Sequence, residues 1–444
     1  MTEGSAKRFA VIGAGVSGLS AAWLLSQRHD VVIYERGARL GGHANTVTVP
    51  GPDGGVDVDT GFIVFNDWTY PNLTALLDHL GVATHASDMS FAVSADDGGF
   101  EYSGGTLAGV FSQPGNLIRP RFWRMLMDLH RFYSTTPALL ASGALDDLTL
   151  GALLDRDGYS AGFQRDHLLP MAAAIWSGTV EGMRDYPAAA FVRFFVNHGL
   201  FKYIGRPTWR TVTGGSRVYV ERISAGVPVR SGGVRAVRRL PDGVTVVDSK
   251  GHEDRFDAVV MAAHADQSLG MLSDPDDLEC ELLSPFRYQK NLAVLHTDTG
   301  LMPARRRAWS SWNYIARPTA GADAHSVCVT YWMNKLQDLG NADDLFVTLN
   351  PAAPPRNETI LRTFQYEHPL FDAHTDDAQQ RLWRLQGHRN TWYCGSYFGA
   401  GFHEDGLQAG LWAAEDAGGV RRPWHVDGES GRIHVRPDPR EAAA

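Results

Sequence analysis

The chain has 444 residues, and 44% of them are hydrophobic, so it is long enough to form two domains with separate cores. Its net charge of −9 gives no general attraction for nucleic acid, and we expect no nucleic-acid partner. The three cysteines, Cys280, Cys328 and Cys394, lie far apart and form no C-x-x-C pair, which argues against a disulfide framework and a zinc site. We therefore predict no metal site.

The sequence contains no run of about 18 apolar residues, the length that a membrane-spanning helix needs. The first predicted strand begins about eight residues from the N-terminus, and no apolar signal stretch precedes it. We therefore expect a cytoplasmic protein that is soluble or peripheral to the inner face of the membrane.

The strongest local signal is a glycine pattern near the N-terminus. Residues 9–12 are apolar and predict a buried strand, and Gly13, Gly15 and Gly18 follow with G-x-G-x-x-G spacing. These glycines allow a tight turn, bring backbone N–H groups close to a pyrophosphate, and let the next helix pack closely on the strand. Residues 19–28 predict that helix, and a second strand over 30–34 leads to Glu35, whose carboxylate is placed to accept ribose hydroxyls. The pattern predicts a dinucleotide site made by Gly13, Ala14, Gly15, Val16, Ser17, Gly18 and Glu35.

Residues 11–43 resemble the N-terminal fingerprint of the flavin amine oxidase and phytoene desaturase superfamily, whose members bind FAD. The resemblance rests on the strand-helix-strand unit and on the residues that follow it, Glu35-Arg36 and Gly41-Gly42-His43. It implies that Arg36, Gly41, Gly42 and His43 also contact FAD. The family usually has arginine at the position of His43, and histidine is only partly charged at neutral pH, so one pyrophosphate contact is expected to be weaker here.

The resemblance implies a fold of the α/β class with α+β insertions, in which a Rossmann-like FAD-binding domain is combined with a discontinuous substrate domain. The FAD-binding domain is expected to comprise residues 1–70, 205–272 and 387–420, and the substrate domain residues 71–204 and 273–386. Residues 421–444 are polar and contain three prolines, and they are predicted to form a loosely held tail.

Later segments extend the resemblance to FAD. Residues 57–62 resemble the segment that passes alongside the flavin, which implies contacts from Thr60 and Gly61, although a strand with a glycine bulge is the alternative. A backbone group near Val229 is implied to meet the adenine. Residues 391–414 resemble the C-terminal FAD segment, with a strand ending at Cys394-Gly395 and a helix beginning near Asp405-Gly406. The N-terminus of that helix would stabilise negative charge on the reduced flavin, and the residues implied there are Gly395, Ser396, Asp405, Gly406 and Leu407.

Amine oxidases of this superfamily commonly place an aromatic residue of an amine-binding cage three positions before the glycine of the C-terminal helix, and here that residue is His403. Its imidazole is the candidate catalytic group, either as a proton acceptor or as a polar anchor. The alternative is a structural histidine that bonds to the loop backbone. In either case the sequence shows no amine cage.

One helix in the expected substrate domain is amphipathic. Phe122, Met125, Leu126, Leu129, Phe132 and Tyr133 fall on one face, while Arg121, Arg124, Asp128 and Arg131 fall on the other. A basic helix with aromatic residues can lie on an anionic membrane, and the same pattern also serves a helix that packs on a core. Peripheral membrane contact through Arg121–Tyr133 therefore stays one of two interpretations.

Over the whole chain, the sequence most resembles bacterial FAD-binding proteins that are associated with cyclopropane fatty acid synthase-like methyltransferases. This implies a lipid acyl substrate and hydride transfer to flavin N5, with an electron acceptor that the resemblance does not identify. Aromatic residues in the inserted segments suit a long apolar cavity, and they are Trp176, Trp209, Trp309, Trp312, Tyr331 and Trp332. The alternatives are an amine oxidase and a flavoprotein that binds lipid without turnover.

Overall fold

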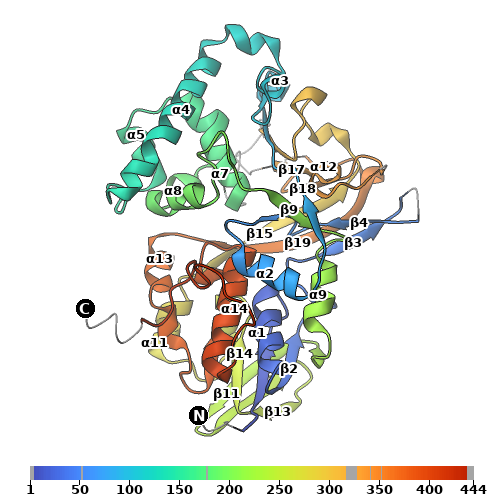
Figure 1. Ribbon diagram of the computed structural model, residues 1–444, viewed down its shortest axis with the longest axis vertical. Helices are drawn as coiled ribbons and strands as arrows, with labels where there is room; N and C mark the ends of the chain where they lie inside the picture. The colour runs from blue at the N-terminus through green and yellow to red at the C-terminus, as the bar shows by residue number, and fades with distance from the viewer. Residues whose placement is uncertain are drawn as a thin grey trace.

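The computed structural model describes residues 5–51, 54–176, 179–316, 328–340, 342–351 and 353–437. A parallel sheet and its helices form one end of the molecule (Figure 1). Helices within residues 107–197, which we call the inserted region, form the other end, and a long mixed sheet lies between the two ends. The described part therefore separates into two regions with separate hydrophobic cores, as the length of the chain predicts.

The parallel sheet has the strand order β10-β2-β1-β14-β20, and its strands come from distant parts of the sequence. They are β1 (Arg8–Ile12), β2 (Asp30–Glu35), β10 (Val229–Ser231), β14 (Ala258–Met261) and β20 (Thr391–Tyr393). The central strands β1 and β14 are fully buried apart from Arg8, as expected for strands covered on both faces. The predicted α/β class with a Rossmann-like domain is confirmed.

Two helices lie against each other on this sheet, α1 (Val16–Ser26) and α14 (His403–Gly418) (Figure 1). Their close approach depends on glycine, because a Cβ on Gly410 would overlap the carbonyl oxygen of Ser17. A Cβ on Gly406 would lie 2.8 Å from the Ser17 hydroxyl oxygen. The first and last predicted FAD segments are thus held in direct contact by their backbones.

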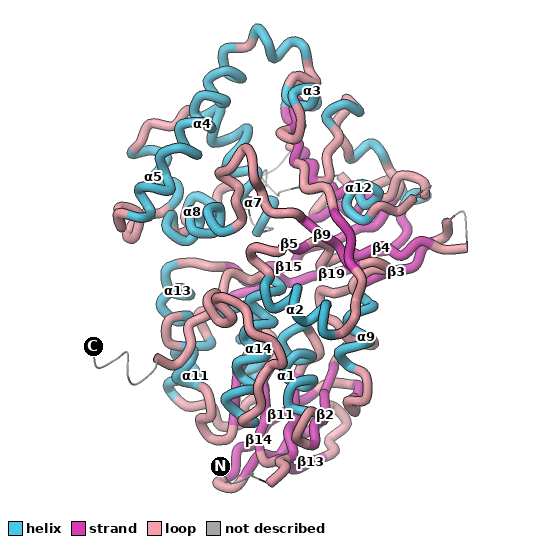
Figure 2. The backbone as a smooth tube through the Cα atoms, in the orientation of Figure 1, coloured by secondary structure: helices cyan, strands magenta, loops and turns pink. Residues whose placement is uncertain are grey.

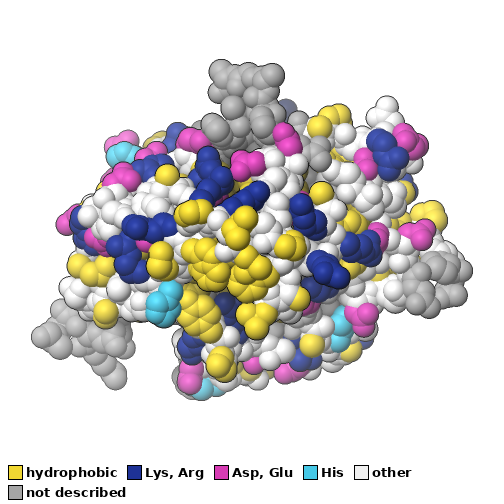
Figure 3. Space-filling model, turned by 90° about the horizontal axis from the view of Figure 1, so that it is seen from above, with side chains coloured by type: hydrophobic (Ala, Val, Ile, Leu, Met, Phe, Trp, Pro, Cys, Tyr) yellow, Lys and Arg dark blue, Asp and Glu magenta, His cyan; other side chains and the backbone are white. Residues whose placement is uncertain are grey.

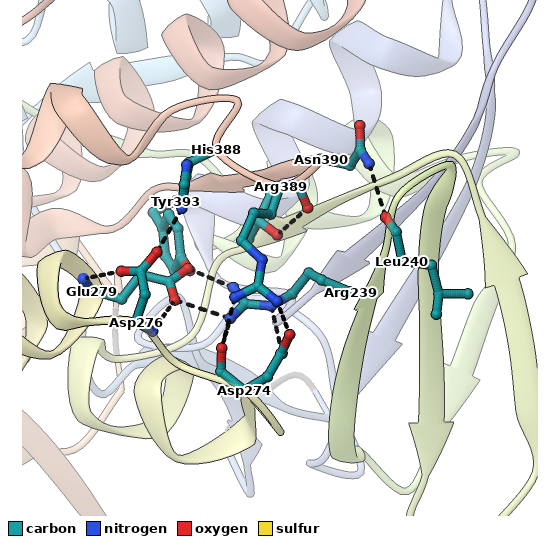
Figure 4. A network of polar contacts seen from close by, with 10 residues as sticks. Arg239, Leu240, Asp274, Asp276, Glu279, His388, Arg389, Asn390 and Tyr393 are labelled. Atoms are coloured by element: carbon teal, nitrogen blue, oxygen red, sulfur yellow. Dashed lines mark hydrogen bonds and ion pairs between the residues drawn. The ribbon is translucent and has the colours of Figure 1, made fainter.

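An antiparallel sheet beside the parallel one consists of β11 (Val234–Leu240), β12 (Gly243–Asp248) and β13 (Glu253–Phe256). Arg239 on β11 is almost fully buried, and its guanidinium donates to Glu279 at 2.5 and 2.9 Å and to Asp274 at 2.8 Å (Figure 4). Tyr393 on β20 donates its hydroxyl to the same Glu279 at 2.6 Å. The network therefore ties the antiparallel sheet and α11 (Asp277–Leu283) to the edge of the parallel sheet.

We predict that Glu279→Gln lowers the free energy of unfolding by about 3 kcal/mol, since it leaves the buried Arg239 guanidinium without its main counter-charge. Burial alone would raise the pKa of Glu279, but hydrogen bonds from Arg239 and Tyr393 outweigh it and hold that pKa below its usual value. The stabilisation is therefore present above about pH 4 and is lost as the pH falls through the lowered pKa. Urea denaturation of both proteins across this range measures the difference.

The matched control is Glu253→Gln, which removes an exposed ion pair with Arg238 on the same antiparallel sheet. It should leave the unfolding free energy nearly unchanged, because surface ion pairs contribute little. Equal stability of the parent and Glu279→Gln at neutral pH would contradict the prediction.

The mixed sheet between the two ends has seven strands in the order β19-β15-β18-β17-β16-β7-β8. The strands are β7 (Phe91–Ala95), β8 (Phe100–Ser103), β15 (Arg287–His296), β16 (Trp312–Ile315), β17 (Cys328–Trp332), β18 (Phe346–Leu349) and β19 (Ile360–Leu370). Strands β7 and β8 form an antiparallel pair, with a turn at 96–99 between them. Both predicted parts of the substrate domain contribute strands to this sheet, while the domain boundaries themselves stay a prediction.

The remaining elements complete the two regions, and Figure 2 shows how helices cover the sheets at each end. Short strands join the regions: β3 (Thr46–Val49), β4 (Val56–Asp59), β5 (Phe65–Asn66), β6 (Thr84–Ala86) and β9 (Trp209–Val212). The helices are α2 (Pro71–His79), α3 (Leu107–Val110), α4 (Pro120–Ala141), α5 (Leu150–Arg156), α6 (Ala161–Phe163), α7 (Leu169–Trp176), α8 (Ala188–Asn197), α9 (Arg217–Ser224), α10 (Ala265–Met271), α12 (Met333–Gln337) and α13 (Ala373–Gln379).

Helix α4 is the predicted amphipathic helix, and its apolar face packs on the core through Phe122, Met125 and Phe132. On the opposite face the arginines pair with acidic residues, and peripheral membrane contact of this face stays a prediction. Asp128 is buried, accepts the backbone N–H of Ser160 at 3.0 Å, and pairs with Arg124 and Arg131. Spacing along the helix places Arg124 and Arg131 beside Asp128, but it does not reveal the bond from Ser160, because Ser160 belongs to another segment of the chain.

The sequence predicts a loosely held C-terminal tail, but the described part of it, residues 421–437, is held by specific contacts. The Arg422 guanidinium is buried and donates to Glu415 at 2.8 and 2.9 Å and to Asn72 at 2.9 Å. Ile433 is buried in the core that surrounds the parallel sheet. The polar composition of the segment concealed these contacts, since each arginine is paired after folding. Pro439 and the rest of 438–444 lie outside the described residues.

Candidate functional site

A cavity of about 910 Å³ runs between the two regions of the fold. Its lining includes residues from every predicted FAD segment and from the mixed sheet. The predicted FAD contacts that line it are Gly13, Ala14, Gly15, Val16, Ser17, Glu35, Arg36, Gly41, Gly42, His43, Thr60, Gly61, Gly395 and Ser396, together with the catalytic candidate His403. These segments are far apart in the sequence, and the fold brings them to one elongated space.

The phosphate-binding features are present where α1 begins. Gly15 is the N-cap residue of α1, no side chain caps the helix, and the first turn contains no acidic residue. A Cβ on Gly15 would meet no atom within 4 Å, so the space next to this turn is open. Free backbone N–H groups at a helix N-terminus beside open space form a site suited to an anion such as a pyrophosphate.

Glu35 lies at the other end of the predicted dinucleotide site. Its two carboxylate oxygens accept the backbone N–H groups of Ala14 at 2.8 Å and Gly37 at 2.6 Å. A carboxylate oxygen has capacity for a second hydrogen bond, so both remain able to accept from a ribose. Glu35 therefore holds the glycine turn in place and also lines the cavity.

His43, which stands in place of the usual arginine, is buried between two other rings of the cavity wall. Its ring centroid lies 5.1 Å from those of Tyr366 and His368. Burial and the neighbouring His368, His264 and His403 hold the pKa of His43 well below its ordinary value. Its Nε2 atom is buried without a hydrogen-bond partner. An orphaned polar atom on a cavity wall fits a ligand with hydrogen-bonding groups, such as FAD.

His403 is also uncharged. Its Nε2 lies 2.6 Å from the Tyr219 hydroxyl oxygen, and its ring stacks on Phe62 with centroids 3.8 Å apart. Burial lowers the pKa of His403 to about 3. The alternative in the sequence analysis was a bond to the loop backbone, whereas the structure shows a bond to the side chain of Tyr219 on α9. A histidine with so low a pKa is a weak proton acceptor, so the geometry favours a polar anchor over a general base.

Five predicted FAD contacts lie away from the cavity. Gly18 packs against Gly13 below the turn, and Val229 pairs with Ile33 in the parallel sheet. The helix expected near 405 begins at His403, so Asp405 accepts the Phe402 N–H at 2.7 Å and pairs with Arg432 at 2.6 Å. Gly406 faces α1, and Leu407 is buried in the core. These residues position the loops that line the cavity.

The structure also adds lining residues that the sequence analysis did not identify. Gly232 and Gly233 follow β10 and donate their N–H groups to the carbonyl oxygen of Glu35 at 2.9 and 3.1 Å, so they lie where Val229 was expected. A glycine pair directly after a strand was the available signal. His264 follows β14 at the carboxyl edge of the parallel sheet, where ligands of such folds bind. His368, on β19, had no local signal.

The far part of the cavity is apolar and aromatic. It is lined by Met89, Ile175, Trp176, Phe194, Leu200, Trp209, Trp312, Tyr331, Leu349, Phe371 and Phe402. Four of the six predicted aromatic residues are among them. Trp309 and Trp332 are not, because they pack on each other with centroids 5.4 Å apart and lie beneath the Arg306 guanidinium. Ser177 and Gly178, which follow Trp176 in the sequence, lie outside the described residues.

We predict that Glu35→Ala weakens FAD binding by about 1–3 kcal/mol, the usual loss when a charged acceptor of hydrogen bonds is removed. Titration of the apoprotein with FAD measures this change. Glu35→Gln is the matched control, because its amide oxygen still accepts from the Ala14 N–H while the charge is lost. An unchanged affinity of Glu35→Ala would exclude the ribose contact.

We also predict that acid precipitation releases all bound flavin. Cys394, the cysteine next to the flavin segment, is buried and does not line the cavity, and burial raises the pKa of its thiol. A buried thiol that is not ionised does not attack a ligand in the cavity. Yellow colour that stays with the precipitated protein would contradict non-covalent binding.

Comparisons with known proteins agree with this geometry. The family model described as flavin containing amine oxidoreductase matches residues 16–337. Solved structures with a similar fold include a CLA-producing fatty acid isomerase from P. acnes, with 17% identity and a TM-score of 0.63 over 92% of this chain and 97% of that one. They also include a cyclohexylamine oxidase from Brevibacterium oxydans IH-35A, with 15% identity and a TM-score of 0.63 over 94% and 99% of the two chains. No curated protein matches the sequence.

A putrescine oxidase bound to putrescine is similar as well, with 15% identity and a TM-score of 0.62 over 92% of this chain and 98% of that one. At such low identity these structures support the fold and nothing finer.

Two negative observations apply to the described residues alone. None of their helices is long and apolar enough to cross a membrane, and they contain no group of His, Cys, Asp or Glu side chains arranged to hold a metal ion.

Proposed function

Because the chain belongs to the family of flavin-containing amine oxidoreductases, we propose that this FAD-dependent oxidoreductase dehydrogenates or desaturates a fatty-acyl or similar apolar substrate. Bound FAD supplies the hydride acceptor, flavin N5. The residues of the chain bind the substrate, orient it and exclude water. The observation that carries the proposal is the composition of the far part of the cavity wall.

The side chains in this part of the cavity wall are mostly apolar, and few side chains of the cavity are charged. Among the described lining residues the carboxylates are Glu35, which holds the glycine turn, and Glu367, which lies 3.5 Å from His264. A protonated amine would need an acidic group or an aromatic cage to replace its hydration. Neutral His403 stands at the family's cage position, and the described residues that line the apolar, aromatic part of the wall include no carboxylate among them. An apolar chain is the better match.

Aromatic packing gives this part of the cavity its shape. The Phe402 ring stacks on Phe194 with centroids 4.9 Å apart and meets the edge of Trp176 at 6.2 Å. His198, packed on Phe194, is neutral because burial lowers its pKa to about 3. These side chains come from α7, α8 and the loop before α14, so the substrate surface is composite. Rigid rings of this kind hold a flexible chain in one position and keep water away from it.

The polar group available for orientation is the pair formed by His403 and Tyr219. Both are enclosed, and the hydrogen bond between them fixes the imidazole plane against Phe62. A neutral imidazole offers a hydrogen bond without demanding an anionic partner. It therefore suits a carboxyl, ester or hydroxyl group near the reacting carbon. The similar CLA-producing fatty acid isomerase supports this substrate class by analogy of fold alone.

The test is anaerobic reduction of the holoenzyme. We expect long-chain unsaturated fatty acids or their phospholipid esters, dispersed in detergent, to bleach the visible absorption of the oxidised flavin. Putrescine and cyclohexylamine are the comparison substrates. Bleaching by amines but not by acyl compounds would replace the proposal by an amine oxidase. Spectral shifts without bleaching would leave a flavoprotein that binds lipid without turnover.

We further predict that Met89→Asp slows acyl-dependent bleaching at least about tenfold while the FAD content stays the same. Met89 lines the apolar part of the cavity. An apolar chain that binds against the new carboxylate has to remove water from that carboxylate, and the free-energy cost exceeds the roughly 1.4 kcal/mol that corresponds to a tenfold change. Met89→Leu is the matched control and should retain the parent rate. Equal rates for Met89→Asp and the parent would place the acyl chain elsewhere.

A further inference from the structure

Exposed apolar side chains are concentrated on one sector of the molecule. Most of the large hydrophobic residues that are exposed in the described chain belong to segments 107–127 and 196–204 or adjoin them at Trp68, and the most exposed are Ile204 at 91%, Ile118 at 86% and Leu107 at 80%. Seen from the end of the molecule that carries α3 and α4, apolar side chains gather near the middle of the face, with Lys and Arg beside them (Figure 3). A continuous patch of this kind marks an interaction surface.

Contacts between these segments show that the residues form one surface. Trp123 and Met127 lie four residues apart on the exposed side of α4, and the Trp123 indole donates to the carbonyl of Leu117 at 2.9 Å, which places Leu117 and Ile118 beside it. At the other end, His130 stacks on Tyr203 with centroids 6.3 Å apart, next to Ile204. We call this surface the apolar patch and define it by Leu117, Ile118, Trp123, Met127, Tyr203 and Ile204.

The segments that carry the patch are basic, although the whole chain has a net charge of −9. Residues 104–144 contain four arginines and one acidic residue, Asp128, whose buried carboxylate is shared by two of them. Residues 187–217 contain five basic residues and no acidic one. Arg206 and Lys202, which flank Tyr203 and Ile204, are exposed. Apolar side chains surrounded by cations are complementary to an anionic bilayer, whose headgroups attract the cations while the interface accepts the apolar groups.

The patch is continuous with the wall of the substrate cavity. Leu200 lines the cavity, and the exposed Tyr203 and Ile204 follow it in the same loop. Ile63, Val64 and Tyr70 also line the cavity, and the exposed Trp68 lies between them. The Lys202 ammonium lies 4.4 Å from the Trp68 ring centroid, so the two segments meet at the surface. The carboxylate of Asp67 is exposed beside Trp68 and opposes anion binding at that edge.

We propose that the apolar patch docks on an anionic lipid bilayer and places the cavity mouth near Trp68 and residues 199–204 against the membrane, so that acyl chains enter from the lipid phase. The role in substrate entry rests on the proposed function, whereas the docking itself does not. The contact surface differs from the arginine face that one of the two interpretations of the sequence placed against the membrane. Arg121 is held by Asp166 and Asp96, and Asp128 holds Arg124 and Arg131.

The experiment is co-sedimentation of the holoenzyme with vesicles. We expect binding to vesicles that contain phosphatidylglycerol, weaker binding to pure phosphatidylcholine, and a decrease at high salt, because salt screens the cationic part of the attraction. Ile118→Glu and Ile204→Glu should each lower the affinity about tenfold, since each removes one isoleucine from the interface. Leu240→Glu is the matched control, an exposed leucine on β11 far from the patch, and should bind like the parent.

Three results would overturn the proposal. The first is that the parent does not sediment with the vesicles. The second is that the double variant Ile118→Glu/Ile204→Glu sediments as much as the parent. The third is that the patch is buried in a dimer, which the double variant dissociates. Flavin content and thermal unfolding show that the variants are folded. Bleaching of the flavin by detergent-dispersed acyl compounds distinguishes failure of the docking proposal from failure of the proposed function. If the proposed function is right, the patch variants should bleach like the parent. If the proposed function is wrong, the parent itself should not bleach.

Discussion

The contact between α1 and α14 is the constraint on which the site depends. Gly410 lets the two helices approach until the backbone of Ser17 fills the space where a side chain would be. This contact sets the uncapped N-terminus of α1 beside the loop before α14, so the turn at Gly13–Ser17 and the loop residues Gly395, Ser396 and His403 line the same cavity. Separating the helices by one methyl group would move both sides of the predicted FAD site apart.

Four neutral histidines line the cavity. His43, His264, His368 and His403 all line it, and burial lowers the pKa of each. Histidines that remain neutral do not repel one another, so they can share a small space that charged residues could not. In this setting the change from the family's arginine to His43 exchanges a fixed charge for a neutral hydrogen-bonding group, and the phosphate charge has to be met mainly by helix N–H groups.

The substrate region is built differently, by rings from separate elements instead of a single motif. Phe402 belongs to the flavin segment, whereas Trp176 and Phe194 belong to α7 and α8 of the inserted region. Their contact couples the two regions of the fold. The same inserted region carries the apolar patch, so one part of the chain serves both the cavity wall and the outer surface.

The sequence by itself determined the local parts of this protein. The glycine turn at Gly13–Gly18 and the position of Glu35 follow from short-range rules, because glycine geometry and strand hydrophobicity act over a few residues. The α/β class and the segment at Gly395-Ser396 were implied by the resemblance to a known superfamily. Only the tertiary structure decided how Asp128, Asp405 and Arg422 are used. Asp128 accepts the N–H of Ser160 and Arg422 donates to Asn72, and both of these partners belong to distant segments. Asp405 pairs with Arg432, which lies beyond its helix. It likewise placed Gly232 instead of Val229 at the cavity and left Ile118 and Ile204 exposed. Burial and ion pairing depend on which distant segments come into contact, and the spacing of residues along the sequence does not specify those contacts.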